Sequence, residues 1–97
     1  MMVLITYDVE TVSAHGQKRL RKVAKICTNY GQRVQNSVFE CIVNPMQLQI
    51  IKEEILKVID MEKDSVRFYH MGSNWSVRVE HMGTKIPLNL ERDNLII

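Results

Sequence analysis

The chain has 97 residues, of which 45% are apolar and 25% charged, and its formal net charge is +2. This composition is typical of one soluble globular domain, residues 1–97. No segment approaches the length of a transmembrane helix, and the short N-terminal apolar run lacks the basic residues of a signal peptide. Cys27 and Cys41 lie on apolar stretches without zinc-type spacing, so we expect reduced core thiols in a cytoplasmic protein.

The first predicted element is a strand over residues 2–8, because its residues up to Tyr7 are apolar, aromatic or β-branched and it ends on Asp8. A polar connection over residues 10–16 follows. A helix is predicted over residues 17–30, where apolar side chains recur with helical spacing, and Gly31 is its stop signal.

Residues 33–43 predict a hairpin of two strands with Asn36-Ser37 as its turn or bulge. Asn44 is a suitable N-cap and Pro45 a suitable first residue for a second helix, which we expect to end near residue 60. Acidic residues cluster along this helix and the loop after it, and we interpret them as solvated: Glu53, Glu54, Asp60, Glu62 and Asp64.

A further strand is predicted over residues 65–71, ended by Gly72, and a short one over residues 76–80. The order βαββαβ predicts an α+β, ferredoxin-like domain, an antiparallel sheet with two helices on one face. Its core covers about residues 1–82, and a C-terminal strand extension covers residues 83–97 with an apolar tail at 95–97. The uncovered sheet face would expose Tyr7, Phe68 or Tyr69 and the tail, which predicts an interface.

Positive charge collects on the first helix and the segment after it. Between residues 18 and 33 there are six basic residues and no acidic ones: Lys18, Arg19, Arg21, Lys22, Lys25 and Arg33. This asymmetry indicates one positive face of the kind that binds nucleic acid, although a solvated basic helix face explains it equally well.

Asp8 is where we expect chemistry, because a carboxylate at the mouth of an apolar strand is costly to bury without a partner or a metal. The sequence holds no P-loop, dinucleotide-binding turn, nucleophile elbow or histidine pair with zinc spacing. Asp8 could hold Mg²⁺ if phosphates, waters or the second Asp8 of a two-fold dimer complete the octahedron. Alternatively, Asp8 caps a turn with Thr11 or Ser13.

The segment Val3–Val9 resembles the opening strand of the CRISPR-associated protein two family, the small partner of the spacer-acquisition integrase, which ends in Tyr-Asp. A second block, Arg33–Glu40, contains the Ser-Val-Phe core of that family. Spacing and element order agree over nearly the whole chain. Ser65–Tyr69 and Asn74–Glu80 resemble the type I-C branch.

The resemblance implies a homodimer that acts in CRISPR immunity as an Mg²⁺-dependent endonuclease on single-stranded RNA or double-stranded DNA. It also implies a partnership with the CRISPR integrase. It assigns the metal to Asp8 and places Tyr7, Arg33 and Phe39 as catalytic residues beside it. The expected nucleic-acid-binding residues are Lys18, Arg19, Arg21, Lys22 and Arg33.

Three functions are therefore open at this point. The first is the endonuclease acting in spacer acquisition. The second is a non-catalytic DNA-binding scaffold that bridges integrase dimers, in which Asp8 is incidental. The third is a ribonuclease toxin of similar fold.

Overall fold

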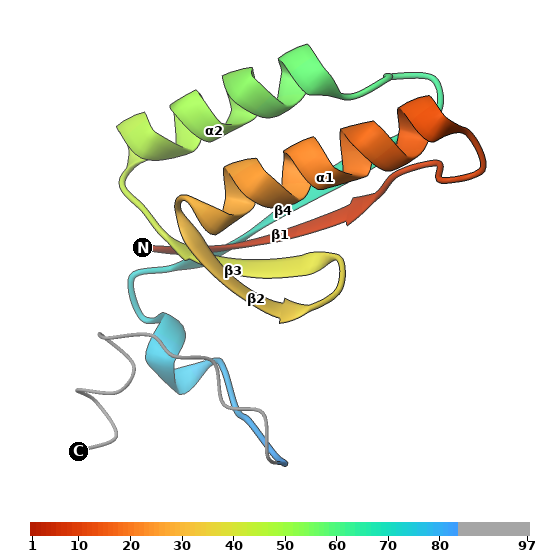
Figure 1. Cartoon of the computed structure of the whole chain (residues 1–97). Helices are drawn as coiled ribbons and strands as arrows, with labels where there is room; N and C mark the ends of the chain where they lie inside the picture. The colour runs from red at the N-terminus through yellow and green to blue at the C-terminus, as the bar shows by residue number, and fades with distance from the viewer. Residues whose placement is uncertain (84–97) are drawn as a thin grey trace.

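The computed structural model describes residues 1–83, and within them the elements follow the predicted order. They are β1 (Met2–Asp8), α1 (Ala14–Thr28), β2 (Gly31–Gln35), β3 (Val38–Ile42), α2 (Pro45–Val58) and β4 (Ser65–Gly72). The strands form one antiparallel sheet in the order β2-β3-β1-β4, and both helices lie on one side of it (Figure 1). The predicted ferredoxin-like fold is confirmed. The predicted apolar tail lies outside the described residues.

Both helices begin where a polar side chain satisfies the first free backbone N–H groups. Ser13 Oγ accepts a hydrogen bond from Gly16 N at 3.0 Å, so α1 begins at Ala14, earlier than the predicted residue 17. Asn44 and Gln47 form a reciprocal capping box at the start of α2, with Pro45 in the first turn. The prediction for α2 is confirmed.

The core lies between the sheet and the helices. In β1 the odd-numbered residues face the helices, and Val3, Ile5 and Tyr7 are buried there with Phe39 of β3. The prediction that Tyr7 is exposed on the uncovered sheet face is wrong, because its side chain belongs to the core and is only 5% exposed.

On β4 the two predicted aromatic candidates separate. Phe68 packs partly buried against the core, whereas Tyr69 is 43% exposed. Since successive strand residues point to opposite faces, Tyr69 lies on the face of the sheet that the helices leave open.

A short 3₁₀ turn, η1 (Trp75–Val77), follows β4 on the side of the sheet away from the helices (Figure 1). The predicted strand over residues 76–80 is therefore wrong, and Trp75 is buried at 5% exposure. No helix among residues 1–83 is long and apolar enough to cross a membrane.

Candidate active site at the end of β1

Asp8 is the last residue of β1 and is exposed to solvent. It pairs with Ser65, the first residue of β4, and lies in an open hollow of about 360 Å³ at this end of the sheet. The hollow is lined by Thr6, Tyr7, Asp8, Ser37, Val38, Ser65 and Arg67. Within residues 1–83 the Asp8 carboxylate has neither a hydrogen bond nor an ion pair, so its oxygens are free to bind a cation.

Arg67 is the cation nearest to Asp8 in the sheet register, and the sequence prediction missed it. Its backbone pairs with Thr6, which lies on the same face of β1 as Asp8 because the two are separated by one residue. Arg67 Nη1 donates a hydrogen bond to Tyr69 Oη at 3.2 Å, and this bond raises the pKa of Arg67. The alternation of β4 was visible in the sequence, but only strand pairing shows that Arg67 stands beside Asp8.

Tyr7, Phe39 and Arg33 form a stack behind the hollow. The rings of Tyr7 and Phe39 lie 6.1 Å apart at 24°, and the Arg33 guanidinium lies 5.2 Å from the centre of the Phe39 ring. Tyr7 Oη donates to Asn36 O at 3.2 Å. Burial raises the pKa of Tyr7, against the opposing effect of Arg33, so the phenol stays protonated at neutral pH.

The stack therefore differs from the predicted catalytic arrangement. Tyr7 contributes to the wall of the hollow, but Phe39 and Arg33 are not among its lining residues. Phe39 is fully buried and cannot touch a substrate. These side chains support the end of β1 from the helix side, while Asp8 points to the other face.

A second hollow, of about 550 Å³, lies between α1 and the end of α2. We call it the lysine groove after the four lysines that line it: Lys18, Lys22, Lys57 and Lys63. The other lining residues are His15, Arg19, Val58 and Asp60. Lys18 and Lys22 were expected to lie on a positive face. The sequence prediction missed Lys57 and Lys63 because they lie within the acidic stretch of the chain.

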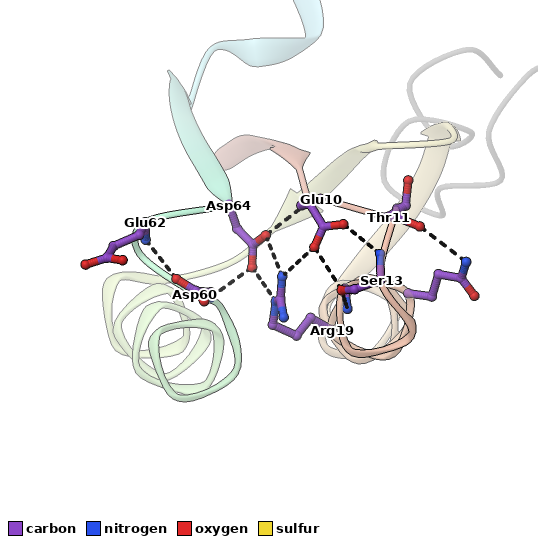
Figure 2. Close-up of polar contacts among 9 residues, drawn as sticks. Glu10, Thr11, Ser13, Arg19, Asp60, Glu62 and Asp64 are labelled. Carbon is purple, nitrogen blue, oxygen red and sulfur yellow. Dashed lines mark hydrogen bonds and ion pairs between the residues drawn. The ribbon is translucent and has the colours of Figure 1, made fainter.

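Arg19, a predicted nucleic-acid contact, is held in ion pairs with two carboxylates. Arg19 Nε donates to Asp64 Oδ2 at 2.7 Å, and Nη2 lies 3.5 Å from Glu10 Oε2 (Figure 2). Its side chain is only 16% exposed, so the guanidinium is largely covered and its charge is paired with these carboxylates. Arg21 is exposed on α1 but does not line the lysine groove.

Asp64 was interpreted as part of a solvated acidic loop, and this is wrong. Its side chain is 0% exposed. Burial by itself would raise the pKa of Asp64, but hydrogen bonds from Arg19 and from the backbone of Asp60 and Glu10 outweigh it and hold the pKa below its usual range.

Glu10, not Asp8, caps the turn that leads into α1. Its carboxylate accepts from Ser13 N at 2.8 Å and from Ser13 Oγ at 3.0 Å. These bonds lower the pKa of Glu10, and the bond from the Ser13 backbone N–H has the larger effect. The alternative that Asp8 caps this turn is therefore wrong.

The donor set at Asp8 suits a hard cation. A carboxylate oxygen is a normal ligand of Mg²⁺, which keeps several waters and shares substrate phosphates instead of requiring an all-protein cage. Residues 1–83 hold no group of three or more histidine, cysteine or acidic side chains that could enclose a metal by themselves. A cation at Asp8 would thus be completed by ligands from outside the described part of this chain.

Similarity to known proteins identifies the family of this chain. A family model described as "CRISPR associated protein Cas2" matches residues 1–79. The chain belongs to the Cas2 family. The prediction of the family is confirmed.

Relatives within the Cas2 family cover almost the whole chain. The CRISPR-associated endonuclease Cas2 of Halalkalibacterium halodurans is 62% identical over 91 residues, which is 94% of this chain and 95% of that one. The CRISPR-associated endoribonuclease Cas2 of Chlorobaculum tepidum is 55% identical over the same shares of the two chains. These names confirm the prediction of a CRISPR-associated nuclease at the level of the family.

A solved structure supports the fold. The crystal structure of Streptococcus pyogenes Cas2 at pH 6.5 superimposes with a TM-score of 0.76 and 58% identity, covering 86% of this chain and all (100%) of that chain. Asp8, Arg67 and the lysine groove therefore sit on a Cas2 fold.

Proposed function

We propose that this chain is an Mg²⁺-dependent endonuclease that hydrolyses phosphodiester bonds in RNA or double-stranded DNA, with Asp8 as the metal ligand. The observation that carries the proposal is the free, exposed Asp8 carboxylate beside the Arg67 cation in an open hollow. The proposal places this activity in spacer acquisition with the CRISPR integrase, in the cytoplasm, and in the type I-C branch that Ser65–Tyr69 and Asn74–Glu80 resemble.

Three residues of the hollow, Asp8, Arg67 and Tyr7, are considered in the proposed reaction. Asp8 binds the cation through its carboxylate, and Arg67 binds a phosphate oxygen of the substrate beside it. Bound Mg²⁺ supplies a more acidic water and neutralises phosphate charge. The protonated Tyr7 phenol is not a general base, so the attacking water loses its proton to solvent.

The proposal includes a homodimer in which the open sheet faces meet. Asp8 and the 43% exposed Tyr69 both lie toward that face, and one chain offers a single carboxylate to the metal. A two-fold axis through the face would bring a second Asp8 toward the first and cover Tyr69. This arrangement supplies the missing protein ligand.

A second candidate function, the DNA-binding scaffold, is favoured by the lysine groove. The groove lies on the helix side of the molecule, whereas Asp8 points to the open face of the sheet. A phosphate backbone could lie in the groove without reaching Asp8. Arg21 and Arg33 stay predicted nucleic-acid contacts outside the groove.

The experiment compares cleavage of single-stranded RNA and duplex DNA, in Mg²⁺ and in EDTA, by the wild type and Asp8→Asn. Asn keeps the shape and one acceptor oxygen but removes the charge that holds the cation. We expect Asp8→Asn to lose cleavage by at least about a hundredfold while its thermal melt and its nucleic-acid binding stay unchanged.

Glu53→Gln is the matched control, because it neutralises one exposed carboxylate on α2, away from the hollow. It should cleave like the wild type. Binding without Mg²⁺-dependent cleavage by the wild type would favour the scaffold. Full cleavage by a well-folded Asp8→Asn protein would remove Asp8 from the metal site.

A further inference from the structure

Asp64 lies where the end of β1 and the start of β4 meet, next to the candidate active site. It directly precedes Ser65, whose backbone pairs with Asp8 at the end of β1. Its buried carboxylate accepts hydrogen bonds from three segments of the chain (Figure 2). The junction is thus connected to Asp8 through the sheet, and through the Asp64 side chain to Glu10, two residues after Asp8.

The contacts of Asp64 are short and directional. Oδ1 accepts from Glu10 N at 3.1 Å and from Arg19 Nη2 at 3.3 Å, and Oδ2 accepts from Arg19 Nε at 2.7 Å and Asp60 N at 2.8 Å. The bidentate pairing with Arg19 adds geometric specificity, because the planar guanidinium fits a carboxylate in one orientation. Asp64 therefore ties the connection after β1 and the connection before β4 to α1.

Glu10 is held from the other side as well. An added Cβ at Gly16 would lie 1.8 Å from Glu10 O, so the backbone of this connection rests directly on the first turn of α1. Arg19 and Ser13 hold the Glu10 carboxylate. Residue 10 is therefore bonded through its N–H and its side chain, and its carbonyl packs against Gly16.

Asp8 itself has no side-chain partner within residues 1–83, so the backbone on either side of it is what sets the position of its Cβ. That backbone continues through Val9 into Glu10, where the contacts of Asp64 and Gly16 converge. A shift of Glu10 would move Asp8 relative to Arg67 across the hollow.

We infer that Asp64, acting with Arg19 and Glu10, is a positioning residue that sets where the Asp8 carboxylate stands for metal and substrate. The inference rests on the proposed role of Asp8. It assigns to a buried ion pair on the helix side a function at the opposite face of the sheet. None of the three side chains is among the residues lining the hollow around Asp8.

The test uses Asp64→Asn in the full chain. Asn keeps the size of the side chain. Its NH₂ group, however, would face N–H donors that in the wild type meet a carboxylate oxygen. We expect kcat with Mg²⁺ to fall at least about tenfold, with KM for nucleic acid within about threefold of the wild type. Independently of activity, amide hydrogen exchange at residues 9–11 should rise at least about tenfold in the metal-free protein.

Ile51→Ala, a fully buried α2 position, is the control for general loss of stability. Both variants are assayed well below their melting temperatures. The control should keep its kcat and its local exchange at residues 9–11 even if it melts as early as Asp64→Asn. If the two variants lose kcat and local protection alike, Asp64 is only a stabilising residue and the inference is overturned.

Arg19→Lys provides a second variant if Asp64→Asn does not fold, since it keeps the charge but loses the bidentate geometry. In Arg19→Lys, kcat and the local protection of residues 9–11 should both fall, but less than in Asp64→Asn. Unchanged values would overturn the inference.

Asp8→Asn is run in parallel. If Asp8→Asn cleaves fully, the proposed function fails. If Asp8→Asn is inactive while Asp64→Asn or Arg19→Lys is fully active, only the positioning role fails.

Discussion

At the scale of single residues, two aspartates at one end of the sheet have opposite environments. Asp8 is exposed and without a side-chain partner in residues 1–83, which suits a carboxylate that binds a cation. Asp64 has a fully covered side chain whose oxygens all accept hydrogen bonds, which suits a structural carboxylate. The difference arises because a buried charge is tolerated only when paired, whereas an exposed one can exchange its water for a metal.

The two cysteines give a prediction at this scale. Burial raises the pKa of Cys27 to about 12 and that of Cys41 to about 11. Since the thiolate is the reactive species, almost none is present at pH 8, and the side chains are covered as well. We expect neither thiol to react with a disulfide reagent in the native protein at pH 8. Both should react rapidly in guanidinium, and fast labelling of folded protein would contradict the burial of these residues.

At the scale of elements, the first turn of α1 is shaped by what packs on it. Ser13 caps the helix, Glu10 bonds back to Ser13, and the Glu10 carbonyl lies against Gly16. The backbone of Glu10 can lie this close to the first turn of α1 because glycine at position 16 has no Cβ.

Gly16→Ala tests this packing, because two effects oppose each other. Alanine at a helical position is favoured over glycine by about 1 kcal/mol. The new Cβ would, however, lie 1.8 Å from a backbone oxygen, which must move. We expect a net destabilisation of about 1–3 kcal/mol in urea unfolding, as for other overpacked sites. A stabilised Gly16→Ala protein would show that the connection yields easily.

At the scale of the whole molecule, the sheet separates two charged surfaces. The open sheet face presents Asp8 and Arg67, and the helix layer presents the lysine groove. Under the proposed function, substitutions in the lysine groove and at Asp8 should therefore alter nucleic-acid binding and cleavage separately.

The lysine groove yields the prediction for this scale. Replacing Lys18, Lys22, Lys57 and Lys63 by Ala should weaken nucleic-acid binding and flatten its salt dependence. The log–log slope should fall by about 0.7–0.9 for each phosphate that the protein no longer neutralises. Lys25→Ala, on the same helix but not among the groove lysines, is the control and should change the slope less. Equal slopes for the wild type and the fourfold variant would remove the groove from the binding surface.

Local signals in the sequence predicted the strands and helices from β1 to β4 and singled out Asp8, although they also predicted a strand over residues 76–80 where the structure has η1. Asn44 and Pro45 predicted the start of α2, the β-branched run predicted β1, and Asp8 at its end was identified as the candidate ligand. These features could be read because caps, periodicity and strand ends depend on neighbouring residues in the chain.

Only the tertiary structure decided which side chains meet. β1 is apolar on both faces, so nothing local showed that Tyr7 points to the helices. Arg67 stands beside Asp8 through the β1–β4 register, and Arg19 meets Asp64 across 45 positions of sequence. Such pairs leave no periodic trace in the sequence, because they depend on how whole elements pack and on which charges that packing takes out of water.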